Sequence, residues 1–109
     1  LSSSSAASDV YKRQVLLKCA HSVISDPMGK TWQIGEVDSS VARTGLGDVL
    51  AGFVSGMGAI SLASTGELET NLLAAAALMH AYAGASCSRG SNASAVCTRL
   101  AELIKKESP

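Results

Sequence analysis

Hydrophobic and polar positions divide the chain into a short extended part and a longer helical part. Apolar residues gather in short runs at 15–18, 22–26 and 31–34, which predicts three short strands. Asp26-Pro27-Met28-Gly29-Lys30 lies between the second and third runs and has Pro and Gly where a tight turn needs them. The extended part therefore predicts one strand followed by a hairpin.

From residue 48 to about 63 the apolar residues recur at helical spacing. The opposite side of this helix has small residues, including Gly52 and Gly56. An interior glycine destabilises a helix by roughly 0.5–1 kcal/mol relative to alanine, so close packing against another backbone must offset that cost. We therefore expect this helix in the centre of a layer. The expected core face comprises Val49, Leu50, Phe53, Val54, Met57 and Ile60.

Two further helices are predicted in the last part of the chain. Ser64-Thr65-Gly66-Glu67 has the spacing of a capping box and precedes an Ala-rich helix from 68 to about 85. Asn92 is expected to cap a last helix, with two lysines near its C-terminus. Its expected inner stripe comprises Val96, Leu100, Leu103 and Ile104. Three short strands and three successive helices indicate the end of a larger α/β domain.

Composition narrows the classes of partner and location. The 109 residues have a formal net charge of zero, which argues against binding to nucleic acid or to an acidic membrane surface. Cys19, Cys87 and Cys97 lack the spacing of metal ligands, which predicts no structural metal and a reducing, cytoplasmic location. Ser, Gly, Thr and Glu interrupt residues 55–71, so we expect no membrane-spanning segment.

The first fourteen residues differ from the rest of the chain. Residues 1–14 are rich in serine and have no period, and they resemble the adapter-derived leader of fragmentary reading frames. We therefore set residues 1–14 aside as a non-native leader. We expect residues 15–109 to be the C-terminal portion of a domain that extends further upstream.

The strongest candidate for chemistry is Thr44-Gly45-Leu46-Gly47-Asp48, directly before the first helix. Two glycines at a helix N-terminus leave backbone N–H groups open to an anion, and Asp48 adds a candidate base. Neither the P-loop spacing nor the Rossmann spacing of glycines is present. From the pattern alone, an ordinary turn with Asp48 as N-cap is an equally good interpretation.

Three segments together resemble a known family. Residues 44–52 are similar to the Gly-Ser/Thr-Gly-Asp-Val-Leu-x-Gly signature of the ADP- or ATP-dependent NAD(P)H-hydrate dehydratases, a branch of the ribokinase-like superfamily. Residues 15–24 resemble that family's Val-Leu-Leu-Lys-Gly-x-x-Thr-Val-Ile strand, and residues 74–81 resemble its Ala-rich helix with a histidine. The resemblance implies an α/β, ribokinase-like three-layer fold that is incomplete in this chain.

The resemblance also implies a site and a reaction. Asp48 would contact the substrate as the catalytic residue, and the amides of Gly45, Leu46 and Gly47 would form an anion hole. The residues implied to hold the adenine nucleotide are Lys18, Cys19, Ala20, His21, Ser22 and Gly47. The implied cofactors are ADP or ATP with Mg²⁺, without a metal site built from side chains. The implied reaction is a hydro-lyase repair of NAD(P)H hydrate (NADHX or NADPHX) to NADH or NADPH, in a homo-oligomer.

Some residues depart from the family pattern, and two alternatives stay open. Leu46 stands where the family usually has Ser or Thr, Cys19 replaces a glycine, and Arg43 occupies a position where a small residue is expected. One alternative is another ribokinase-like small-molecule kinase, and the other is an inactive, truncated nucleotide-binding polypeptide. His80 is expected to be a core histidine with its hydrogen bonds satisfied rather than a catalyst.

Overall fold

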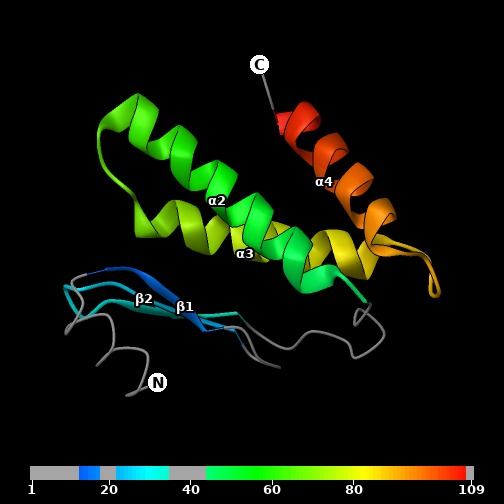
Figure 1. The fold of residues 1–109 in the computed structure, drawn as a ribbon, viewed down its shortest axis with the longest axis horizontal. Helices are drawn as coiled ribbons and strands as arrows, with labels where there is room; N and C mark the ends of the chain where they lie inside the picture. Colours follow the sequence, from blue (N-terminus) through cyan, green and yellow to red (C-terminus); the bar gives the residue numbers. More distant parts are fainter. Residues whose placement is uncertain (1–12, 18–21, 35–43, 108–109) are drawn as a thin grey trace.

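The computed structural model describes residues 13–17, 22–34 and 44–107. Residues 1–12 of the predicted leader lie outside this part of the chain. Gln14, the last residue of the predicted leader, donates a hydrogen bond from its side chain to the carbonyl of Leu68 (2.9 Å). The described elements are β1 (Val15–Leu17), β2 (Val23–Ser25), β3 (Thr31–Gln33), α2 (Leu46–Thr65), α3 (Thr70–Ser86) and α4 (Ala93–Glu107), as Figure 1 shows. The predicted α/β order of strands followed by helices is confirmed.

The three strands form an antiparallel sheet in the order β1-β2-β3. Ile24 in the central strand pairs with Leu16 on one side and Trp32 on the other. The predicted turn between β2 and β3 is also confirmed: the Asp26 carboxylate accepts hydrogen bonds from the N–H groups of Met28 and Lys30 (2.9 Å each). Because the aspartate side chain is short, it can accept hydrogen bonds from the backbone N–H groups two and four residues later in the chain, and these bonds stabilise a tight turn.

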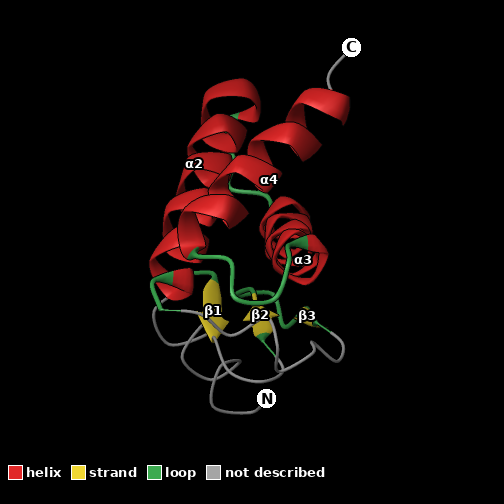
Figure 2. Cartoon of the chain, turned by 90° about the vertical axis from the view of Figure 1, so that its right-hand side faces the viewer, coloured by secondary structure: helices red, strands yellow, loops and turns green. Residues whose placement is uncertain are grey.

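All three described helices lie on one side of the sheet (Figure 2). One apolar cluster fills the space between the sheet and the helices, and a second lies among the helices. The buried members of the first cluster are Ile24, Ile34, Leu50, Ala74 and Ala77. Those of the second are Leu46, Ala83, Val96 and Leu100. Leu46 and Leu50 are one helical turn apart, so the start of α2 is held by both clusters.

The exposed side of α2 corrects the prediction about its glycines. Gly52 and Gly56 are exposed, and apart from the neighbouring backbone of α2 itself, no described atom lies within 4 Å of the position that a Cβ would take at either residue. Ile60, expected in the core, is 60% exposed. Close packing occurs at Gly58 instead, where a Cβ would lie 2.9 Å from Cδ1 of Leu68. Because α2 is apolar around most of its circumference, its pattern could not identify the side that faces α3.

The connection between α2 and α3 corrects the predicted capping box. Gly66 has a positive φ of 78° and donates its N–H to the carbonyl of Leu62 (3.0 Å), which ends α2 with a left-handed glycine C-cap. Helix α3 begins only at Thr70. The segment Ser64–Glu67 therefore ends one helix rather than starting the next, because only glycine adopts this conformation without strain.

Helix α4 agrees with its sequence pattern. The side-chain oxygen of Asn92 accepts a hydrogen bond from the N–H of Ala95 (3.1 Å), which confirms the predicted cap. Val96 and Leu100 are buried, whereas Ile104 at the edge of the stripe is 39% exposed. A helix with one apolar and one polar side can pack in only one orientation, so its pattern predicted its inner face.

Among the described helices, α2 is long and apolar enough to cross a membrane by length and composition. The expectation that Ser, Gly and Thr interrupt the segment too often was therefore too strict. Length and composition are a weak indication by themselves, because core helices of soluble proteins meet the same criteria. Figure 1 shows α2 lying across α3 in the helix layer, as a helix of an α/β domain does.

Candidate functional site

The glycine turn forms the first turn of α2. Gly45 is the N-cap residue, with φ 84° and ψ −3°, and no side chain of the described residues caps this end of the helix. The carbonyl of Gly45 accepts the N–H of Val49 (3.2 Å) and so begins the helical hydrogen bonding. The interpretation of Asp48 as an ordinary N-cap is therefore wrong. The first N–H groups of an α-helix have no intrahelical partner, so this turn presents backbone donors.

Leu46 anchors the turn in the helix core. Its side chain is 7% exposed and packs with Ala83, Val96 and Leu100. Its carbonyl lies 3.2 Å from Nε2 of the buried His80. In the sequence, Leu46 was noted because it lacks the hydroxyl that the family usually has at this position. In the structure, its apolar side chain is buried and holds the turn against the helices. The backbone N–H, which an anion would use, does not depend on that side chain.

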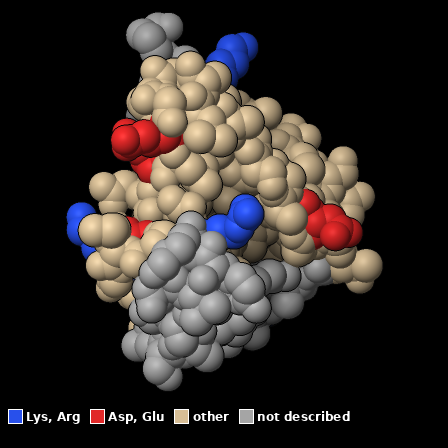
Figure 3. Space-filling model, turned by 60° about the vertical axis from the view of Figure 1, so that its left-hand side comes forward, with Lys and Arg blue, Asp and Glu red and all other residues tan. Residues whose placement is uncertain are grey.

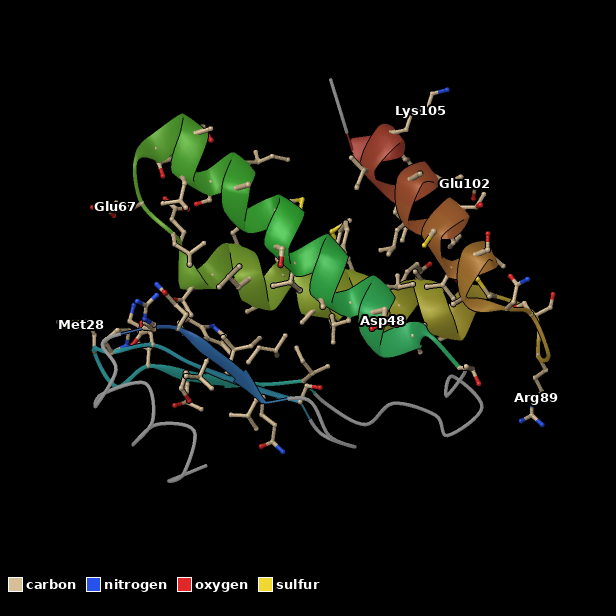
Figure 4. All side chains as sticks on the ribbon, viewed as in Figure 1. Met28, Asp48, Glu67, Arg89, Glu102 and Lys105 are labelled. Atoms are coloured by element: carbon tan, nitrogen blue, oxygen red, sulfur yellow. The ribbon has the colours of Figure 1, made fainter. Side chains whose placement is uncertain are left out.

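Asp48 lies in the first turn of α2 with an exposed side chain (Figure 4). Within the described ranges, no hydrogen bond or ion pair engages its carboxylate. The neighbouring Gly47 is partly exposed. The positive end of a helix dipole stabilises negative charge in its first turn, both on a carboxylate and on a bound anion. The arrangement therefore offers an accessible carboxylate beside backbone donors.

The start of α4 lies against this turn, which no local sequence signal indicated. A Cβ placed on Gly45 would lie 3.5 Å from Cβ of Ala93, the first residue of α4. The N-termini of α2 and α4 are thus side by side, although 48 positions separate Gly45 from Ala93 in the sequence. Two helix N-termini that meet add their partial positive charges at one place, which favours an anion there.

The predicted nucleotide segment is described only at its end. Lys18, Cys19, Ala20 and His21 lie outside the described residues, as does Arg43. Ser22 is half-buried, and its carbonyl accepts a hydrogen bond from the N–H of Ile34 (2.9 Å). In Figure 1 the end of β1 and the start of β2 point toward the end of the molecule at which α2 begins. No hydrogen bond between described residues joins Ser22 to Gly47.

The described residues contain no side-chain cluster for a metal ion, and one face of the molecule has no continuous basic patch (Figure 3). Residues 13–17, 22–34 and 44–107 contain no group of three or more His, Cys, Asp or Glu side chains that could hold a metal ion. Magnesium that binds with a nucleotide needs only one or two carboxylates besides the phosphates, so a single aspartate is compatible with it. The face drawn in Figure 3 has scattered acidic and basic side chains rather than a continuous basic patch.

Comparisons with known proteins give the chain a family context. A sequence model of the NAD(P)H-hydrate dehydratase family matches residues 1–107. The chain is also 39% identical over 79 residues to the bifunctional NAD(P)H-hydrate repair enzyme Nnr of Synechocystis sp.. The aligned region covers 72% of this chain but only 14% of that relative, so the chain spans a small part of the relative's length. No solved structure matches the chain.

Proposed function

Because the chain belongs to the NAD(P)H-hydrate dehydratase family, we propose that it supplies part of the catalytic site of an ADP- or ATP-dependent dehydratase. The full-length protein would return NAD(P)H hydrate to NADH or NADPH. The observation that carries this proposal is the turn at Gly45–Asp48, where open backbone donors and an exposed carboxylate share one helix start. A repair enzyme of this type needs both groups within reach of one bound substrate.

The turn has the properties that a nucleotide phosphate requires. Among the described residues, no side chain caps this helix start, so the amides of Leu46 and Gly47 can serve an external acceptor. The adjacent start of α4 adds a second positive helix end. We propose that Gly45, Leu46 and Gly47 hold the phosphates through their N–H groups. Lys18 to Ser22 would hold the rest of the adenine nucleotide, and Mg²⁺ would bind with its phosphates.

Asp48 is proposed as the base. The nucleotide, when bound, supplies the phosphoryl group that makes the substrate hydroxyl a leaving group, and elimination then restores the dihydropyridine ring. Asp48 accepts the hydroxyl proton as the hydroxyl oxygen attacks phosphorus. The N–H groups of the turn stabilise the charge on the phosphoryl oxygens. The role of Asp48 requires an ionised and accessible carboxylate, and its exposure supports that requirement.

Recovery of reduced nicotinamide tests the proposal. The full-length protein is incubated with NADH hydrate and either ADP or ATP, and the absorbance of reduced nicotinamide is followed. We expect Asp48→Asn to lower the rate by about 10²–10⁴-fold, the usual contribution of a general base, and to leave ADP binding unchanged. Glu67→Gln is the matched control, because Glu67 is an exposed acid just beyond the far end of the same helix.

Each result discriminates between the candidate functions. Full activity of Asp48→Asn would exclude Asp48 as the base. If the wild-type protein instead phosphorylates a sugar, pyrimidine or thiazole alcohol and leaves NADH hydrate unchanged, the alternative of a small-molecule kinase is correct. Binding of ADP without either reaction would support the alternative of an inactive nucleotide-binding polypeptide.

A further inference from the structure

His80 connects α3 to the first residue of α2. Its side chain is only 6% exposed, and its Nε2 lies 3.2 Å from the carbonyl oxygen of Leu46. A carbonyl oxygen can only accept a hydrogen bond, so Nε2 must be the atom that carries the hydrogen. The bond therefore requires that the imidazole ring carry a hydrogen on Nε2. It also joins residues 34 positions apart in the sequence.

The peptide unit that receives this bond contains the amide of Gly47. The carbonyl of Leu46 and the N–H of Gly47 belong to one planar trans peptide, in which they point in opposite directions. A group that orients the carbonyl therefore orients the N–H as well. On this geometry, which rests on the proposed function, we propose that His80 is a positioning residue that aims the Gly47 N–H at a nucleotide phosphate.

Besides the helical hydrogen bond that the Leu46 carbonyl accepts from the N–H of Leu50, two contacts with other helices hold this peptide unit. The Leu46 side chain is buried among α3 and α4, and the Leu46 carbonyl is bound by His80. A hydrogen bond to the carbonyl also polarises the peptide, which strengthens its N–H as a donor. Asp48 is the next residue after Gly47, so rotation of this peptide would also displace the proposed base. His80 thus acts on the turn from inside the core, without contacting the ligand.

Variants at position 80 separate positioning from ordinary core packing. His80→Leu removes the donor at similar volume. His80→Gln retains a donor near the position of Nε2, whereas His80→Asn is polar but too short to reach the Leu46 carbonyl. Leu73→Ala is the control for lost stability, because Leu73 is a buried residue of α3, 7% exposed, that lies near the C-terminal half of α2, where a Cβ on Gly58 would be 3.6 Å from its Cδ2. Gly47 and Leu46 are unchanged in all four variants.

The measurements are made on full-length protein labelled with ¹⁵N-glycine, with the Gly47 amide signal identified by its loss in Gly47→Ala. We expect His80→Leu and His80→Asn to shift the Gly47 amide signal and to weaken ADP affinity roughly tenfold, the effect of about 1.4 kcal/mol in one hydrogen bond. His80→Gln should restore the affinity to within about threefold of wild type. Leu73→Ala should lower the melting temperature and leave both readouts unchanged.

The proposal is overturned if His80→Leu leaves the Gly47 signal and ADP affinity at their wild-type values. It is also overturned if Leu73→Ala weakens ADP binding as much as His80→Leu does, or if Gln and Asn at position 80 behave alike. The proposed function fails separately, when the wild-type protein neither binds ADP nor converts NADH hydrate. In that case the Gly47 signal still decides whether His80 orients the peptide, because it needs no ligand.

Discussion

Leu46→Thr distinguishes two roles for the residue between the glycines. The substitution supplies the hydroxyl that the family signature usually has at this position. A side chain directed at the phosphates would then gain a hydrogen bond, and nucleotide affinity would rise. The structure predicts the opposite result, because the Leu46 side chain is 7% exposed and packs with Ala83, Val96 and Leu100.

The expected loss of stability follows from this burial. Truncation of a buried leucine to alanine destabilises a protein by about 2–5 kcal/mol. Threonine refills part of the volume, but burial of a hydroxyl without a partner costs about 1–3 kcal/mol. We therefore expect Leu46→Thr to lower the free energy of unfolding by roughly 2–4 kcal/mol. Domains of this size have only about 5–15 kcal/mol in total, so the change should be large.

Urea unfolding followed by circular dichroism measures the loss, and ADP titration measures the effect on the site. Leu46→Met keeps the volume and should cost less than about 1.5 kcal/mol. Leu78→Thr makes the same chemical change at a residue that is 58% exposed on α3, and should cost less than about 1 kcal/mol. The reasoning is refuted if Leu46→Thr is no more destabilising than Leu78→Thr, or if it tightens ADP binding.

Substitutions at three further places test other parts of the structure. Gly56→Ala should raise the free energy of unfolding by about 0.5–1 kcal/mol, because the position is helical and exposed. Gly58→Ala should stabilise the protein less, because its new methyl group must displace the Leu68 side chain. Equal rises in melting temperature for the two variants would contradict the packing at Gly58. Gly45→Ala should lower the free energy of unfolding by about 1–2 kcal/mol, because the φ of 84° at this position strains any residue with a Cβ. An unchanged melting temperature would contradict this backbone conformation. Asp26→Ala should cost about 1–2 kcal/mol in urea unfolding by removing the acceptor of two backbone N–H groups, and Asp26→Asn, which keeps a side-chain oxygen, should cost less.

The glycine turn shows how far sequence could predict the candidate site. A helix at the glycine turn and the place of Asp48 near its start were predictable, because glycine spacing and a helical pattern are local signals; the first helical residue is Leu46 rather than the predicted Asp48. The inward direction of Leu46, its bond to His80 and the neighbouring start of α4 were not. Those features depend on residues from separate helices, and no local pattern specifies which helices meet. The nucleotide role of Lys18 to Ser22 and of Gly47, the cytoplasmic location and the homo-oligomer stay predictions.

The sequence by itself determined the local elements of this protein. It specified three strands, the turn at Asp26, three helices and the inner side of α4, because each depends on neighbouring residues and on a clear division between polar and apolar positions. Tertiary structure decided the orientation of α2, which is apolar on most sides and offers several equivalent faces to a core. Contacts with α3 and α4 selected the face that contains Leu46 and Leu50, and that choice left Asp48 exposed.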